Sequence, residues 1–135
     1  MAVQLSVAVR NARADTVEST IGASAVLKIR SGAQPATCAT ADSGTVLATL
    51  ALPSDWMAAA SAGAKALSGT WQDLTADNSG TAAHFRVYDS GGTTCGIQGT
   101  VTVTGGGGDM TLDSVSVTAG QQVTVTSFGW TEPNA

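Results

Sequence analysis

The chain has 135 residues, of which only 12% are charged and 4% are aromatic, and its formal net charge is −4. This length suits one domain with a real hydrophobic core. The acidic balance, with ten Asp and Glu against six Lys and Arg in no run, disfavours binding to a nucleic-acid backbone and electrostatic anchoring to a membrane.

The charged fraction lies well below the roughly 25% of ordinary soluble domains. Ala, Val, Thr, Ser and Gly supply most of the remainder, which predicts a neutral, hydroxyl-rich surface. Such a surface permits burial against other subunits, because little net charge keeps copies apart. A weakly charged monomer is the alternative that composition leaves open.

No apolar run approaches the roughly 18 residues that span a bilayer. The first residues lack the early positive charge of a signal peptide, so synthesis in the cytoplasm is expected. In that reducing compartment Cys38 and Cys95 are predicted to be buried thiols, with a disulfide formed after release as the alternative.

Residues 1–22 are predicted to form a separate N-terminal segment with one amphipathic helix over 4–21. Val9, Val17 and Ile21 recur at helical spacing, and Gly22 is placed to cap the C-terminal end. The strand-like alternation of residues 3–9 leaves open a start near Val9.

From residue 23 the pattern changes to short strands separated by turn residues. In chain order the expected elements are a strand at 24–31, a strand at 45–52, a short helical turn at 54–60, and strands at 66–74, 83–88, 95–104, 110–117 and 122–130. The runs 83–88 and 95–104 predict the clearest hairpin. The parity of apolar residues shifts at 113–114 and again after Val125, which predicts two bulges or bends.

Gly99 lies in the apolar row of its strand, where a close backbone approach or a bulge is expected. Gly105 to Gly108 predict a loop with positive φ angles. With seven or so strands and no helix available for crossovers, residues 23–135 are predicted to form an antiparallel β-sandwich, either jelly-roll or immunoglobulin-like.

Catalytic chemistry is not expected. His84 is the only histidine, and no Gly-x-Ser-x-Gly elbow accompanies it. The carboxylate pairs Asp73 with Asp77 and Asp109 with Asp113 lie beside turns, where Asp commonly caps the backbone. The spacing matches no calcium loop and no phosphate loop. The sequence therefore predicts no catalytic residue, no metal and no cofactor.

Five residues are candidates for an interface rather than a reaction. Val9, Arg13 and Val17 belong to the N-terminal segment, which together with the glycine loop is the expected contact element. Trp56 and Trp130 border polar segments, and Trp is enriched at binding hot spots. The alternative role of both tryptophans is to anchor the core, because so few aromatics are present.

Six stretches, spread over nearly the whole chain, are similar to small virion-associated proteins of tailed bacteriophages: 9–13, 18–22, 27–32, 50–53, 85–89 and 107–112. The resemblance implies a structural protein of the virion. It implies a head-decoration (cement), head-fibre or neck position and no enzyme, and it carries no residue-level binding motif.

The leading hypothesis is a capsid decoration or cement protein that binds the major capsid protein and forms symmetric trimers or dimers. A neck, tail or head-fibre component is the alternative position on the particle. A β-sandwich module that attaches the virion to host glycan is the runner-up of a different class, and a hydrolase is third.

Overall fold

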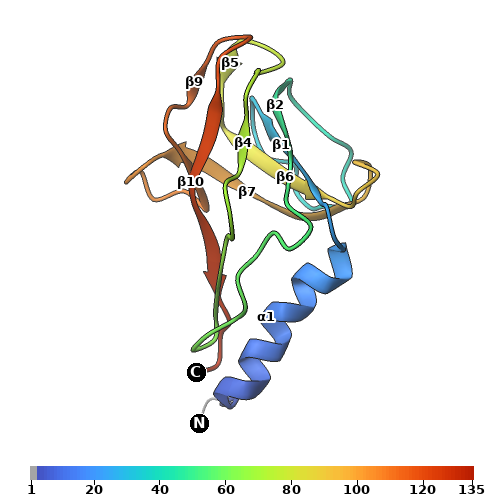
Figure 1. The fold of residues 1–135 in the computed structure, drawn as a ribbon, viewed down its shortest axis with the longest axis vertical. Helices are drawn as coiled ribbons and strands as arrows, with labels where there is room; N and C mark the ends of the chain where they lie inside the picture. Colours follow the sequence, from blue (N-terminus) through green and yellow to red (C-terminus); the bar gives the residue numbers. More distant parts are fainter. Residues whose placement is uncertain (1–2) are drawn as a thin grey trace.

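The computed structural model describes residues 3–135 (Figure 1). It is mainly β with one N-terminal helix, as predicted. The elements are α1 (Val7–Ile21), β1 (Val26–Arg30), β2 (Val46–Ala51), β3 (Ala64–Ala66), β4 (Gln72–Asp73), β5 (Gly80–Thr81), β6 (His84–Tyr88), β7 (Cys95–Val103), β8 (Met110–Leu112), β9 (Ser116–Val117) and β10 (Val123–Thr131).

Helix α1 begins three residues later than the predicted position 4 and two before Val9. Ser6 caps it, since its hydroxyl accepts the N–H of Val9 at 3.2 Å. Gly22 ends the helix as predicted, with φ +99° and its N–H donated to the carbonyl of Glu18. The helix lies outside the sheet, beside the end of β10 (Figure 1).

Eight strands form one curled sheet in the order β2-β1-β6-β7-β8-β10-β3, with β4 also paired to β10. The sheet curls into a half-barrel, in which β2 at one end approaches β4 and the segment that follows β4. There the Thr49 N–H on β2 donates to the Asp73 carboxylate at 3.0 Å, and the Asp77 N–H donates to the Leu47 carbonyl at 2.8 Å. These contacts protect the edge of β2 from pairing with another chain.

The prediction of purely antiparallel sheets is wrong for one pair, since β7 and β8 run parallel, with Val101 opposite Met110. Parallel neighbours ordinarily need a crossover of a dozen or more residues. Here the glycine run lets the chain return in six. Gly105 and Gly107 have φ near +84°, and the Gly108 N–H donates to the Thr102 hydroxyl at 3.0 Å. The sheet is therefore mixed, and the predicted two-sheet sandwich is not confirmed.

The predictions of individual strands, turns and bends were confirmed in part. The hairpin of β6 and β7 is confirmed, as are the bend at 113–114 that separates β8 from β9 and the irregularity after Val125 in β10. The helical turn predicted at 54–60 is wrong, because isolated bridges join Met57 to Leu67 and Ser61 to Ala64 instead. The strand predicted at 66–74 is wrong over most of its length, since β3 ends at Ala66 and β4 covers only Gln72–Asp73, and β5 was missed.

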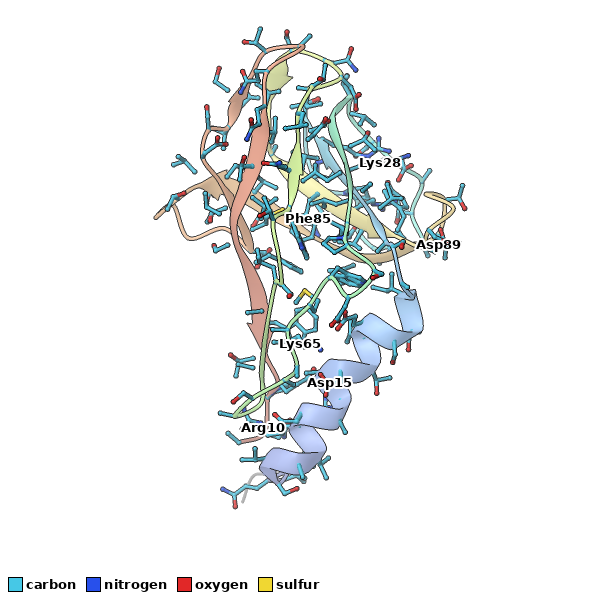
Figure 2. All side chains as sticks on the ribbon, viewed as in Figure 1. Arg10, Asp15, Lys28, Lys65, Phe85 and Asp89 are labelled. Carbon is cyan, nitrogen blue, oxygen red and sulfur yellow. The ribbon has the colours of Figure 1, made fainter. Side chains whose placement is uncertain are left out.

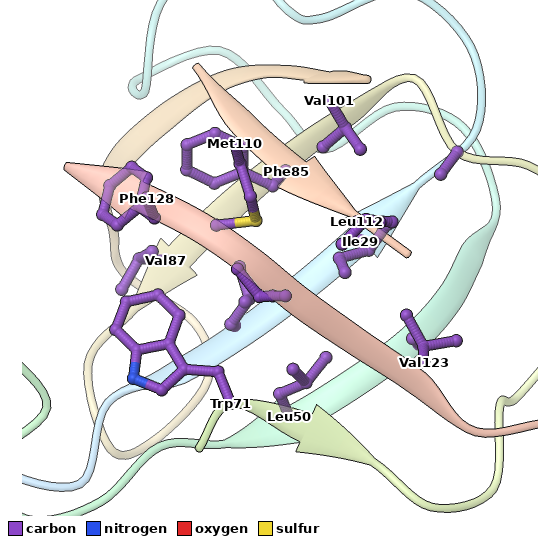
Figure 3. Packing of buried hydrophobic residues seen from close by; sticks show 14 of the residues in the cluster. Ile29, Leu50, Trp71, Phe85, Val87, Val101, Met110, Leu112, Val123 and Phe128 are labelled. Atoms are coloured by element: carbon purple, nitrogen blue, oxygen red, sulfur yellow. The ribbon is translucent and has the colours of Figure 1, made fainter. Parts of the chain in front are cut away.

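The core fills the concave side of the curled sheet (Figure 3). Its centre is aromatic: Phe128 lies 5.6 Å from Trp71 and 5.3 Å from Phe85 between ring centroids. Gly99 makes the close approach predicted for it, because a Cβ there would lie 2.7 Å from the Phe85 ring. The glycine of β7 thus leaves room for an aromatic ring from β6.

Candidate interaction surface

The side of α1 that faces the body of the protein is polar apart from the buried Ala14 and the half-buried Val17 and Ile21. The facing segment, residues 57–63, has backbone N–H groups that no strand satisfies, and side-chain oxygens of the helix accept them: Asn11 from Gly63 at 2.8 Å, Asp15 from Ala60 at 3.0 Å and Glu18 from Met57 at 3.0 Å. We call this set of three contacts the polar ladder. It holds the helix through hydrogen bonds where an ordinary surface helix would bury apolar side chains.

Two basic residues complete this inward face (Figure 2). The buried Lys65 ammonium lies 2.6 Å from Asp15 and 3.0 Å from Glu18. Burial disfavours its charge, but the hydrogen bonds to both carboxylates outweigh burial and raise the pKa of Lys65 above 10.5. Arg10, also buried, donates to the carbonyl of Glu132 at 2.8 Å. The helix is thus tied to β3 and to the C-terminal segment.

The outward side of α1 carries small and uncharged residues. Exposed there are Ala8, Val9, Ala12, Thr16, Ser19 and Thr20, with Arg13 at the margin. Val9, the largest apolar residue among them, has 47% of its surface exposed. The predicted apolar row is therefore wrong at Val9, which is exposed, whereas Val17 and Ile21 are half-buried and Ile21 packs against the core. The reason is that residues 57–63 need acceptors, so the helix turns its polar groups inward.

An open apolar groove of about 370 Å³ lies between α1, β7 and β10. Its apolar lining is Val17, Phe85, Ile97, Phe128 and Trp130, with Gln98 and Asp109 as polar neighbours. A smaller hollow of about 290 Å³ adjoins it and shares Val17 and Gly96. The outward side of α1 and this groove together are the candidate interaction surface.

Four of the five predicted interface residues lie at this surface. Val9 and Arg13 are exposed on the outward side, Val17 is half-buried at the boundary with the groove, and Trp130 lines the groove with its Nε1 donating to Glu132 at 3.2 Å. Trp56, the fifth predicted residue, does not lie at this surface. It is completely buried, and its Nε1 donates to the Gly22 carbonyl at 2.9 Å, so it anchors the core beneath the end of α1.

A buried polar cluster on the other side of the sheet was missed from the sequence. Arg86 on β6 is only 2% exposed. Its guanidinium donates to Asp42 at 2.8 Å, to the carbonyls of Thr37 and Thr40 at 2.9 Å each, and to Gln98 at 3.1 Å. Arg30 and Tyr88 also donate to Asp42, at 3.0 and 2.6 Å. The cluster fastens residues 31–45 over β1, β6 and β7.

The signal for this cluster lies in a strand pairing that only the structure reveals, because β1 and β6 are far apart in the chain. Lys28 on β1 lies opposite Arg86 on β6, and like charges directly opposite each other are destabilising. A register that brings these basic residues together therefore implies an acid over that face. Asp42 fills this role from the loop between β1 and β2.

We expect the stabilisation from Asp42 to disappear in acid. Partial burial alone would raise its pKa, but hydrogen bonds from Tyr88 and Arg86 and the charges of Arg30 and Arg86 hold it below 3.8. A lowered pKa stabilises the fold above the ordinary value and loses that effect as the pH falls through the folded-state value. Urea unfolding should therefore show a difference between wild type and Asp42→Asn that is constant above about pH 5 and shrinks below about pH 4.

Asp55→Asn, at an exposed carboxylate, is the matched control for this series. A gap between wild type and Asp42→Asn that stays unchanged down to about pH 2.5 would contradict a charged Asp42 as the source of the stabilisation.

The residues considered for catalysis have structural partners. His84 is completely buried, with Nδ1 2.9 Å from the Gly32 carbonyl and Nε2 unpartnered. Asp73 accepts the Thr75 N–H at 3.0 Å within its own turn, in the manner predicted for a turn-capping Asp. Asp109 accepts both the N–H and the hydroxyl of Thr100. Among residues 3–135 no group of three or more His, Cys, Asp or Glu side chains is arranged to hold a metal.

Comparison with known proteins adds no assignment: no family model, no curated protein and no solved structure matches the chain. Within residues 3–135, α1 is too short to cross a membrane.

Proposed function

We propose that the chain is a non-enzymatic structural subunit of a tailed-phage virion, and specifically a capsid decoration or cement protein that binds the head shell. Its partners would be the major capsid protein and further copies of itself in a trimer or dimer. Its place would be on the virion after synthesis in the host cytoplasm. The observation that carries the proposal is the reversed helix, with charges inward and small uncharged residues outward.

The free energy of dehydration explains why this arrangement suits assembly. Burying a charged side chain without a partner is costly, whereas burying Val, Ala or the methyl of Thr is favourable or nearly neutral. On α1 the ionic residues Arg10, Asp15 and Glu18 have partners inside the protein, and Arg13, at the margin of the outward side, pairs with Glu132 at 3.4 Å. A neighbouring subunit could therefore cover the outward side without leaving an unpaired charge. The low charge of the whole chain favours the same use.

The copy number of the chain in purified particles tests its place on the virion. Quantitative mass spectrometry against the major capsid protein should find hundreds of copies per head, as expected for decoration of a whole shell. Six or twelve copies would overturn decoration in favour of the neck or tail. Absence from purified particles would overturn the virion assignment itself.

Val9→Asp should separate assembly from folding. A carboxylate in the first turn of a helix interacts favourably with the helix dipole, and α1 has no acid there. The fold should therefore be unchanged or slightly more stable. An unpaired charge buried at an interface should weaken self-association or head binding at least about tenfold. Analytical ultracentrifugation and co-sedimentation with purified heads measure both.

Leu74→Asp is the matched control for Val9→Asp. It adds the same charge at a leucine that is 65% exposed and lies outside the candidate interaction surface, so association should be retained. Equal loss in both variants would indicate a general charge effect. No loss in Val9→Asp would remove the outward side of α1 from the interface.

The groove favours a second candidate, a module for attachment to host glycan. Trp130 lies beside Gln98 and Asp109 there, and an aromatic face with amide and carboxylate groups suits a sugar ring. Both polar groups already have internal partners, however: Gln98 donates to the Pro35 carbonyl, and Asp109 accepts from Thr100. A glycan array with the oligomer tests this candidate, and absence of signal would count against it.

A further inference from the structure

The loop between β1 and β2, residues 31–45, lies across the strands β6 and β7 and is fixed there at several points. Gln98 on β7 donates its amide to the Pro35 carbonyl at 2.8 Å. Arg86 on β6 donates to the carbonyls of Thr37 and Thr40 at 2.9 Å each. Cys38 stands between the last two anchor points, so its backbone is held close to the sheet.

Cys95 opens β7, opposite Tyr88 of β6 in the strand register. Its thiol donates to the Ile97 carbonyl at 3.4 Å, and Cys38 is the side chain that most strongly affects its pKa. Both cysteines are reduced and half-buried. Two side chains separated by more than fifty residues in the sequence are therefore neighbours, because the loop anchors hold Cys38 over the strand pair that carries Cys95.

We propose that Cys38 and Cys95 are a reversible crosslinking site, at which a disulfide fastens the loop 31–45 covalently to β7. The oxidant is a small-molecule disulfide such as glutathione disulfide. One protein thiolate attacks it and displaces one glutathione thiolate. The second protein thiolate attacks the resulting mixed disulfide and displaces the other. Two protein thiols are oxidised, and one glutathione disulfide is reduced to two glutathione thiols.

The surroundings determine how fast the crosslink forms. Burial and the neighbouring Cys38 raise the pKa of Cys95 to about 12, so little of it is thiolate at neutral pH. Because the thiolate is the reacting form, closure should accelerate about tenfold for each pH unit between about 7 and 9. The crosslink would therefore be slow to form near neutrality.

The experiment is oxidation of the purified full-length chain with glutathione disulfide, followed by peptide mapping without reduction. We expect a monomer lighter by about 2 Da and a crosslinked pair of peptides containing Cys38 and Cys95. Because the bond would close a long loop, its formation should raise the melting temperature by about 10 °C. Dithiothreitol should return both the mass and the melting temperature to their starting values.

Cys38→Ser and Cys95→Ser are the matched controls, since each retains one thiol and can form only a glutathione adduct or an intermolecular bond. Oxidation should leave their melting temperatures nearly unchanged. The proposal would be overturned if the wild-type chain gave only glutathione adducts or covalent dimers. It would equally be overturned if the crosslinked monomer were absent after prolonged oxidation at about pH 9. These readouts are independent of any role on a virion.

Discussion

Arg86→Ala is expected to lower the free energy of unfolding by about 3–5 kcal/mol. The substitution removes the buried guanidinium whose four hydrogen bonds join β6, β7 and the loop 31–45. The carbonyls of Thr37 and Thr40 lose their donor, and Asp42 keeps only Arg30 and Tyr88 as partners. Urea denaturation followed by tryptophan fluorescence gives the free energy directly.

Arg13→Ala is the matched control for Arg86→Ala, because the side chain of Arg13 is 46% exposed and its ion pair with Glu132 spans 3.4 Å. Exposed pairs of this kind contribute under about 1 kcal/mol. A similar small loss in both variants would mean that Arg86 and its partners do not stabilise the fold.

Phe128→Ala is expected to cost about 3–5 kcal/mol, as usual for truncating a buried aromatic. Phe128 is the residue at which the rings of Trp71, Phe85 and Trp130 meet, at centroid distances of 5.6, 5.3 and 5.9 Å. Its removal leaves a cavity under the groove that rigid strands on either side cannot close. Calorimetric melting at neutral pH measures the loss.

Two further variants serve as comparisons for Phe128→Ala. Phe128→Leu keeps most of the volume and should recover more than half of the lost stability. Leu74→Ala removes an exposed side chain and should change stability by less than about 0.5 kcal/mol. If Phe128→Ala were as mild as Leu74→Ala, the aromatic cluster would not be the centre of the core.

Several predictions that rest on short-range patterns were confirmed, although the helical turn at 54–60 was not. The alternation in β6 and β7 predicts their hairpin, Gly22 predicts the end of the helix, and the parity shift at 113–114 predicts the bend after β8. Each of these features is decided by residues within a few positions of one another. Local propensity and turn chemistry are enough for them.

Predictions that depend on distant partners failed for a common reason. The direction of α1 is set by N–H groups of residues 57–63, about forty to fifty positions away. The burial of Arg86 was not predicted, because the carbonyls that surround it come from a loop with no pattern of its own. The parallel pair β7–β8 contradicts a general rule on crossover length, which only the glycine run allows the chain to break.

The polar ladder also governs how this part of the molecule moves. The same hydrogen bonds satisfy the N–H groups of Met57, Ala60 and Gly63 and hold α1 in place, so opening either segment leaves polar groups of the other without partners. The two therefore form one cooperative unit of local unfolding. A partner that covers the outward side of α1 would suppress this opening and protect a stretch of backbone that it never touches.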